Sequence, residues 1–386
     1  MPKRRRWMKK VRLVFGTHNS VPLGASDDEL ELIYQRELKP FLSTLYSHPE
    51  ILLVNYYSGI LLEWLEEFHP EFIMLVAEMV SRKQIELLGG GYYDPVFTII
   101  PGADRIGQIE YLTTYLRKRF GRRPRGSWIT CGVWEPTLAT SMRNSGIEYT
   151  FLDEAYFPMD GLDGMEKCVP CITEDQGKSI MVFPLTSSIG NRIPADTPEK
   201  VVEAVLEYSA RKKDHIVSII MPGSAFSTSR TETAGWLEEF IALIHDRKER
   251  IELFQPFRFG KAETRLKKVY FSGSGGTDGG IAGGFRNNLS RLYNSGLLYS
   301  KMIYAHNLVN QMRGDKYRKR TAREEIWKGQ NHYPYWESGG TGIQRNQTRK
   351  AAYSALIEAE KMTREKGIFK PSIIATDFDM DGLQEF

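Results

Sequence analysis

Residues able to exchange protons, donate hydrogen bonds or stack on a ligand recur directly after short β-branched segments of this sequence. Aromatic rings beside polar groups suit a carbohydrate, because the C–H faces of a sugar stack on rings and its hydroxyl groups need hydrogen-bond partners. The residues in question are His18 and Asn19; Tyr92, Tyr93 and Asp94; Cys131, Trp134 and Glu135; Asp153, Glu154 and Tyr156; and Met221, Pro222 and Ser224. Together they predict a saccharide site, provided that the segments before them end side by side.

The segments before these residues have the composition of strands, and the stretches between them have helical periodicity. Seven apolar runs predict strands, at residues 11–15, 51–54, 85–88, 127–130, 148–152, 179–183 and 216–221. After the first strand, a capping box from Ser26 to Glu29 starts an amphipathic helix that we expect to bend at Pro40. Strands that alternate with helices form a parallel sheet, and seven repeats predict a closed or nearly closed β/α barrel over residues 11–255. Such barrels carry their active sites at the carboxyl ends of the strands.

The composition changes after the barrel. Residues 256–284 are expected to form a linker with a glycine-rich loop, and helical periodicity predicts a helical domain over residues 285–367. Residues 368–386 are expected to begin a truncated β domain. Asp377, Asp379 and Asp381 copy the start of a calcium loop, but the twelfth position of such a loop would fall beyond Phe386. We therefore predict no metal site.

Charge and cysteine content limit the classes of partner and the compartment. The 386-residue chain has 52 basic and 48 acidic residues, and its formal net charge of +4 gives no general affinity for nucleic acid or membranes. No apolar run approaches the roughly 20 residues that a membrane span needs. Three cysteines form no disulfide framework, and we expect Cys168 and Cys171 to be loop thiols rather than a redox pair or half a zinc site. These features predict a cytoplasmic protein.

Several motifs, taken in order, resemble those of a known enzyme family. FGTHNSVPLG, GGGYYDP, WITCGVWEP and FLDEAYF, which begin at Phe15, Gly89, Trp128 and Phe151, resemble successive motifs of the family 57 glycoside hydrolases. The later stretches FRNNLSRLYNSG and IWKGQNHYPYWESGG are similar to the helical domain of the α-amylase and 4-α-glucanotransferase branch. The resemblance implies an incomplete seven-stranded (β/α)7 barrel, a helical domain that completes the cleft, and an α-glucan or oligosaccharide as ligand.

The sequence departs from this family at the positions that carry its chemistry. The resemblance places the nucleophilic Glu of the family at Cys131 and the acid/base Asp, from a DDGEKFG-like stretch, at Met221 or Pro222 within MPGSAFS. Ser20 stands where the family commonly has a second histidine, and Asp94 stands for a usual Glu. The resemblance therefore implies that both catalytic carboxylates are replaced.

The replacements cannot perform the chemistry of the family. Retaining glycosidases use two carboxyl groups about 5 to 5.5 Å apart, one as nucleophile and one as acid/base. A thiol with an ordinary pKa near 8.5 is only a few per cent thiolate at neutral pH, and neither Met221 nor Pro222 can transfer a proton. We therefore predict no catalytic residue and no cofactor, but a glucan-binding site. The expected contact residues are His18, Tyr93, Asp94, Trp128, Cys131, Trp134, Glu135 and Asp153.

Other functions stay open at this point. Glu135 and Asp153 could form a different carboxylate pair, which would make the protein an active 4-α-glucanotransferase or α-amylase. The cleft could also have lost its affinity for sugars, which would leave an interaction scaffold. Metal-dependent deacetylation on a similar barrel needs clustered His and Asp ligands, and the seven histidines show no HxxxH or HxxE spacing.

Overall fold

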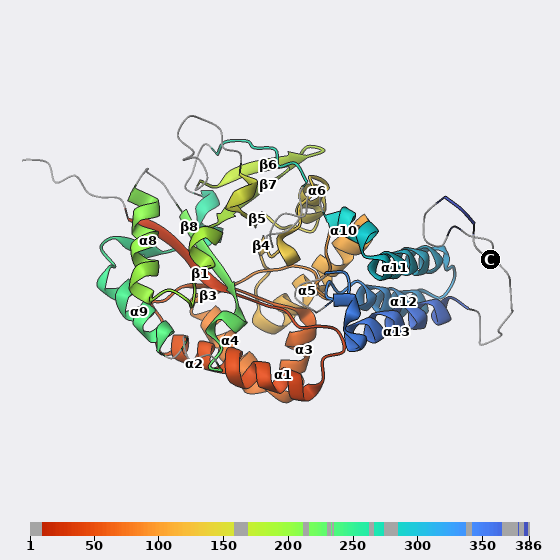
Figure 1. Cartoon of the computed structure of the whole chain (residues 1–386), viewed down its shortest axis with the longest axis horizontal. Coiled ribbons are helices and arrows are strands. Elements are labelled where there is room, and N and C mark those ends of the chain that lie inside the picture. Colours follow the sequence, from red (N-terminus) through yellow and green to blue (C-terminus); the bar gives the residue numbers. More distant parts are fainter. Residues whose placement is uncertain are drawn as a thin grey trace, which may run out of the picture.

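The structure is a computed structural model that describes residues 10–157, 169–210, 216–229, 233, 235–261, 266–273, 285–336, 342–364, 377 and 382–384. The glycine-rich loop from residue 274, Cys168 and most of the expected β domain lie outside the described residues. In Figure 1 a barrel of strands surrounded by helices forms one half of the molecule, and a group of long helices projects from the other. The predicted fold class, a parallel α/β barrel followed by a helical domain, is confirmed.

All seven predicted strands form, and they run parallel. They are β1 (Val11–Asn19), β2 (Leu53–Tyr57), β3 (Ile85–Leu87), β4 (Gly126–Ser127), β5 (Tyr149–Asp153), β7 (Lys178–Leu185) and β8 (Ile216–Pro222). One sheet has the order β3-β2-β1-β8, and the other begins β4-β5-β7. Main-chain hydrogen bonds join the two sheets, from Gly89 N to Gly126 O at 2.8 Å and from Thr186 N to Ser218 O at 2.9 Å.

Two further strands were not predicted. β6 (Cys171–Asp175) pairs antiparallel with β7, so Cys171 lies in a strand and not in the expected loop. β9 (Ile251–Leu253) pairs with residues 11–13 of β1, whereas β2 pairs with residues 16–19 of that strand. β1 is nine residues long and mostly buried, so it pairs with β2, β8 and β9 along different parts of its length and lies inside its sheet.

Helices cover the outside of the barrel. They are α1 (Asp27–Ile33), α2 (Lys39–Tyr46), α3 (Gly59–Phe68), α4 (Pro70–Ser81), α5 (Gly102–Phe120), α6 (Thr137–Asn144), α7 (Ser187–Gly190), α8 (Pro198–Ala210) and α9 (Trp236–Asp246). The predicted capping box of α1 is present, because Ser26 Oγ accepts from Glu29 N and the Glu29 carboxylate accepts from Ser26 N.

The irregularity expected near Pro40 takes the form of a π-helical turn, η1 (Tyr34–Leu38), between α1 and α2. Proline has no N–H, so it cannot donate to the carbonyl of Arg36 four residues earlier. That carbonyl instead accepts from Thr228 N at 2.8 Å and from Thr228 Oγ1 at 3.2 Å. The turn therefore ties the first helical segment to the loop that follows β8, and it brings Glu37 toward the mouth of the barrel.

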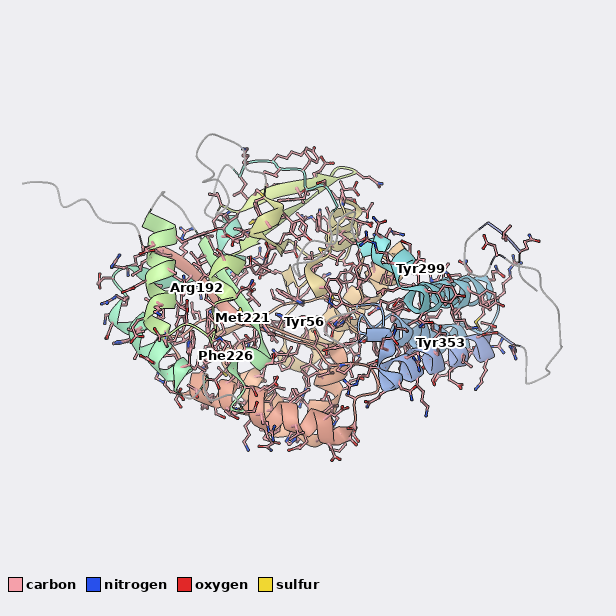
Figure 2. The ribbon with its side chains drawn as sticks, in the orientation of Figure 1. Tyr56, Arg192, Met221, Phe226, Tyr299 and Tyr353 are labelled. Carbon is pink, nitrogen blue, oxygen red and sulfur yellow. The ribbon has the colours of Figure 1, made fainter. Side chains whose placement is uncertain are left out.

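The helical domain consists of α10 (Phe285–Arg291), α11 (Tyr293–Gln311), α12 (Lys316–Gly329) and α13 (Asn346–Thr363). Figure 2 marks it by Tyr299 and Tyr353, whereas Tyr56 and Met221 lie in the barrel half. The domain docks on α5 by way of a buried carboxylate, Asp104. Asp104 accepts from Trp327 Nε1 at 3.2 Å and from Gln330 Nε2 at 2.7 Å. His306 Nδ1 lies 2.7 Å from the same carboxylate.

We predict that Asp104→Ala destabilises the fold by about 3 kcal/mol, because the buried donors Trp327 and Gln330 and the partly buried His306 lose their shared partner at once. Urea unfolding followed by circular dichroism measures the change. Asp246→Ala, at the exposed end of α9, is the matched control and should alter stability by less than about 0.5 kcal/mol. Equal stability of the two variants would contradict the anchoring role of Asp104.

Candidate functional site

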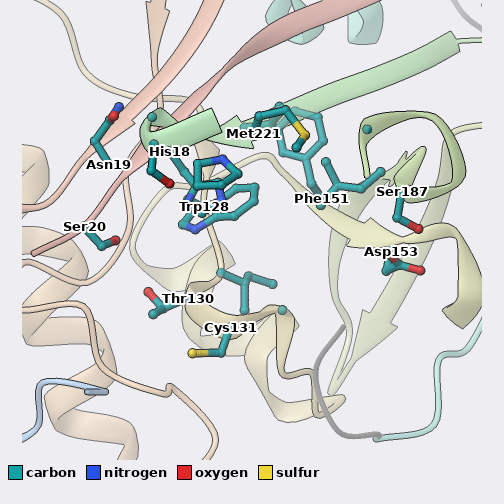
Figure 3. A pocket seen from close by; sticks show the side chains of 18 of the residues that line it. His18, Asn19, Ser20, Trp128, Thr130, Cys131, Phe151, Asp153, Ser187 and Met221 are labelled. Carbon is teal, nitrogen blue, oxygen red and sulfur yellow. The ribbon is translucent and has the colours of Figure 1, made fainter. Parts of the chain in front are cut away.

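A cavity of about 620 Å³ opens at the carboxyl ends of the barrel strands. Its walls come from the ends of β1, β5 and β8, from the segment after β4, and from the loop at residues 331–336 of the helical domain. The volume lies within the range of small-molecule sites, roughly 300 to 1,000 Å³. Figure 3 shows the cavity with its labelled side chains.

An aromatic stack forms one wall of the cavity. The imidazole of His18 lies on the indole of Trp128, with ring centroids 4.4 Å apart and an interplanar angle of 16°. The main chain holds both residues, because His18 pairs with Tyr56 and Pro222 in the sheet and Trp128 N donates to Gly89 O at 2.8 Å. Flat stacked rings beside polar groups are suited to the C–H face of a sugar ring.

The two histidines at the cavity hold neutral rings at physiological pH. Burial lowers the pKa of His18 to about 4, and the neighbouring His332 lowers it further in the same direction. Burial also lowers the pKa of His332 to about 4. The Nδ1 atom of His332 lies 3.0 Å from the main-chain oxygen of Asp94 and is therefore placed to donate to it. Neither ring can supply a proton as a general acid near pH 7.

Cys131 and Asp153, two of the expected contact residues, line the cavity. Cys131 adopts a left-handed conformation, with φ 59° and ψ 6°, in the short turn Thr130–Gly132. That conformation is uncommon for a residue with a side chain and indicates local constraint. Asp153 ends β5, and its Oδ1 accepts from Ala155 N at 2.8 Å. Figure 3 shows the Cys131 thiol on one side of the cavity and Asp153 on another.

Asp94 is not among the lining residues and lies fully buried behind the wall. Its carboxylate accepts hydrogen bonds from the hydroxyl groups of Tyr56 and, at 3.4 Å, Thr130. Burial raises the pKa of Asp94 to about 7, although its hydroxyl neighbours act in the opposite direction. Its main-chain oxygen accepts from His332 N at 3.0 Å. Asp94 therefore positions the loop at residues 331–336.

Tyr93, Trp134 and Glu135 also lie away from the cavity lining. The main chain of Tyr93 bonds to Gln108 and to Asn331, and its ring packs in the core. Trp134 is fully buried and makes an edge contact with Phe271, at a ring-centroid distance of 6.5 Å. Glu135 faces the helical domain and forms an ion pair with Arg286, at 3.2 Å. The turn Thr130–Gly132 after β4 changes the direction of the chain. The side chains of Trp134 and Glu135 therefore point away from the cavity, although both residues lie close to the end of the strand.

The sequence did not single out several residues that do line the cavity. They are Glu37 of η1, Ser187 and Asn191, and His332, Tyr333 and Trp336 of the helical domain. The aromatic run NHYPYW was a usable signal for the last three. Nothing in the sequence marks Glu37, because it reads as an ordinary polar position of an amphipathic helix. It lies in the π-helical turn and lines the cavity. Burial raises the pKa of Glu37.

Comparison with known proteins identifies the family. Residues 7–271 match Glycosyl hydrolase family 57, and residues 283–363 match the middle domain of Alpha-amylase/4-alpha-glucanotransferase. The chain belongs to glycosyl hydrolase family 57. It is 30% identical to Alpha-amylase 1 of Dictyoglomus thermophilum over 98% of this chain and 60% of that protein. It is 28% identical to the 4-alpha-glucanotransferase of Thermococcus litoralis, over 98% of this chain and 61% of that protein.

A solved structure confirms the architecture expected of this family. The crystal structure of the Thermococcus litoralis 4-alpha-glucanotransferase aligns with a TM-score of 0.87, covering 98% of this chain and 63% of that one. The chain thus spans about 60% of the length of these curated relatives. Among the described residues, no group of three or more His, Cys, Asp or Glu could hold a metal ion, and no helix is long and apolar enough to cross a membrane.

We predict that His18 and His332 give the NMR signals of neutral imidazoles from pH 8 down to pH 5, because each pKa lies at about 4. Long-range ¹H–¹⁵N spectra of the histidine rings measure this, with His18→Asn and His332→Asn assigning the signals. Since the unfolded state protonates near pH 6.5, the two groups contribute stability above that pH and lose it as the pH falls toward 4. Titration of either ring with a midpoint near 6.5 would contradict the buried, neutral state.

Proposed function

We propose that this family 57 protein binds an α-glucan or a related saccharide in the cavity and does not cleave it. The proposal rests on one observation. At the two positions where the resemblance places catalytic carboxylates, this chain has side chains that are not carboxylates. The resemblance places the nucleophile of the family at Cys131 and its acid/base at Met221 or Pro222. All three residues line the cavity. A thiol cannot replace the nucleophilic carboxylate of the family. Neither a methionine nor a proline side chain has an exchangeable proton, so neither can replace the acid/base.

The alternative carboxylate pair, Glu135 and Asp153, is not assembled at the cavity. Glu37 and Asp153 are the carboxylates among the described lining residues. One oxygen of Asp153 is engaged by Ala155 N. Glu135, the partner that an alternative mechanism would use, is turned toward Arg286 and lies off the cavity. The arrangement therefore favours binding over an active glucanotransferase or amylase that uses Glu135 and Asp153.

The cavity retains what a saccharide needs for binding. The stack of His18 on Trp128 offers an aromatic surface, and Trp336 and Tyr333 of the helical domain lie across the same space. Asn191, like several serines of the lining, supplies hydrogen-bonding groups for hydroxyls. Relatives named as an alpha-amylase and a 4-alpha-glucanotransferase support an α-glucan as the ligand class.

We also propose that the protein acts in the cytoplasm, without nucleic-acid or membrane partners. The balance of 52 basic and 48 acidic residues and the three cysteines without a disulfide framework support this assignment. Burial raises the pKa of the Cys171 thiol to about 12, which suits an unreactive structural cysteine and not a redox centre.

Maltoheptaose is the probe for this proposal, and isothermal titration calorimetry measures its affinity. We predict that Trp128→Ala weakens binding about tenfold or more, because the variant removes the stacking surface. Tyr317→Ala is the control, since this tyrosine is 80% exposed on the helical domain and away from the cavity. It should leave the affinity unchanged.

Circular dichroism and a melting curve on each variant separate loss of binding from loss of fold. No binding by the wild-type protein would contradict the proposal and favour an interaction scaffold. Equal affinities of the wild-type protein and Trp128→Ala would place the saccharide elsewhere on the molecule.

A further inference from the structure

A second cavity, of about 460 Å³, lies at the opposite end of the barrel. Its walls come from the end of α4, from β3, from the segment before β4, and from the chain after β9. Ile85 is the first residue of β3, and Arg125 directly precedes the first residue of β4. These are the amino ends of the strands, so the cavity is separate from the proposed saccharide site at the carboxyl ends.

Basic residues dominate the charge of this second cavity. Five of them line it: Lys83, Arg122, Arg123, Arg125 and Arg258. Arg125 pairs with Glu148, and Arg123 Nη2 donates to the main-chain oxygen of Ser145 at 2.7 Å. Lys83, Arg122 and Arg258 form no ion pair with any residue that the structure describes. Three cations that form no ion pair around one hollow favour an anionic ligand.

One acid, Glu86, lines the same cavity, but it does not cancel the positive charge. Glu86 is buried, accepts a hydrogen bond from the hydroxyl group of Tyr149, and faces Phe257 N at 3.5 Å. Burial raises the pKa of Glu86 to about 7, while Tyr149, Phe257 N, Arg125 and Arg258 act in the opposite direction. At neutral pH only part of this carboxyl population is charged, so the cationic groups stay in excess.

The rest of the lining is apolar. Val80, Ile85, Leu87, Pro124 and Phe257 form it, and Phe257 presents a half-buried ring beneath the guanidinium of Arg258, which lies 5.4 Å from the ring centroid. A ligand that fills the cavity therefore needs a flat apolar portion in addition to its charge. Inorganic phosphate would use only the basic side of the site.

The uncharged polar groups of the lining distinguish between classes of phosphorylated molecule. Gln255 is the uncharged polar side chain among the described lining residues. Its Nε2 already donates to the main-chain oxygens of Leu53 and Gln84, and its buried Oε1 accepts from none of the described residues. A sugar phosphate such as glucose 1-phosphate would bring about four hydroxyl groups, whereas a nucleotide brings about two on its ribose, and each one left unpaired costs free energy. The flat faces of an aromatic base can pack against apolar side chains.

We propose that this cavity binds a nucleotide, with the phosphates held by Lys83, Arg122 and Arg258 and the base lying in the apolar part of the lining, which includes Ile85 and Pro124. The proposal does not depend on the saccharide function, because it rests on a different cavity. The barrel would then have two ligand sites, one for a saccharide at the carboxyl ends of the strands and one for a nucleotide at their amino ends.

ADP is the probe, and isothermal titration calorimetry on the full chain measures its binding. ADP is expected to bind, and Arg122→Gln and Arg258→Gln are each expected to weaken it about tenfold, because each removes one charge-assisted contact to phosphate. Arg313→Gln, an exposed arginine between α11 and α12, carries the same substitution and should bind as the wild type does. Trp128→Ala should also bind ADP normally, which separates this site from the saccharide cavity.

Pyrophosphate and glucose 1-phosphate complete the experiment. If pyrophosphate and glucose 1-phosphate both bind more weakly than ADP, the result supports a site that also contacts the base of the nucleotide. Pyrophosphate binding as tightly as ADP would overturn the nucleotide assignment and leave an anion site, and tighter binding of glucose 1-phosphate would overturn it in favour of a sugar phosphate. Failure of ADP to bind, or equal affinity in Arg122→Gln, Arg258→Gln and the wild type, would overturn the proposal altogether.

Discussion

The buried carboxylate of Asp104 is the contact on which the rest of this structure depends. It is 2% exposed, on a helix of the barrel, and it gathers donors from two helices of the helical domain and from the residue that follows α12. Gln330 extends the network, because its Oε1 accepts from Gln108 Nε2, and Gln108 Oε1 accepts from Tyr93 N. A buried polar network of this kind stabilises only when every member is paired, so it fixes one docking geometry and excludes others.

That docking geometry shapes the cavity. Asn331 donates to the main-chain oxygen of Tyr93, and His332 bonds to the main-chain oxygen of Asp94. The motif GGGYYDP therefore holds the loop at residues 331–336, from which Tyr333 and Trp336 reach the cavity. Tyr93 and Asp94 thus support the loop at residues 331–336 and lie outside the lining of the cavity.

The sequence predicted the barrel well because strands, caps and apolar periodicity are local features. It missed the three-residue strand β9, and it missed the π-helical turn, because the partner of the freed Arg36 carbonyl, Thr228, lies far along the chain. His18 and Asp153 were placed correctly at strand ends, and Cys131 lies just beyond one. Trp134 and Glu135 were expected at the cavity but lie away from its lining. The three-residue turn after β4 sets the direction of their side chains, and no pattern in the sequence predicts that turn.

The proposal of binding without cleavage rests on a cavity that keeps aromatic walls, while Cys131, Met221 and Pro222 stand where the resemblance to family 57 places the catalytic carboxylates. Catalysis requires groups that act more strongly on the transition state than on the bound saccharide. The most direct test incubates the wild-type protein with saturating maltoheptaose and follows the chain-length distribution by chromatography. The account predicts that maltoheptaose is bound and recovered unchanged. A ladder of longer and shorter products would contradict it, and would show that this family 57 barrel performs its chemistry with other groups.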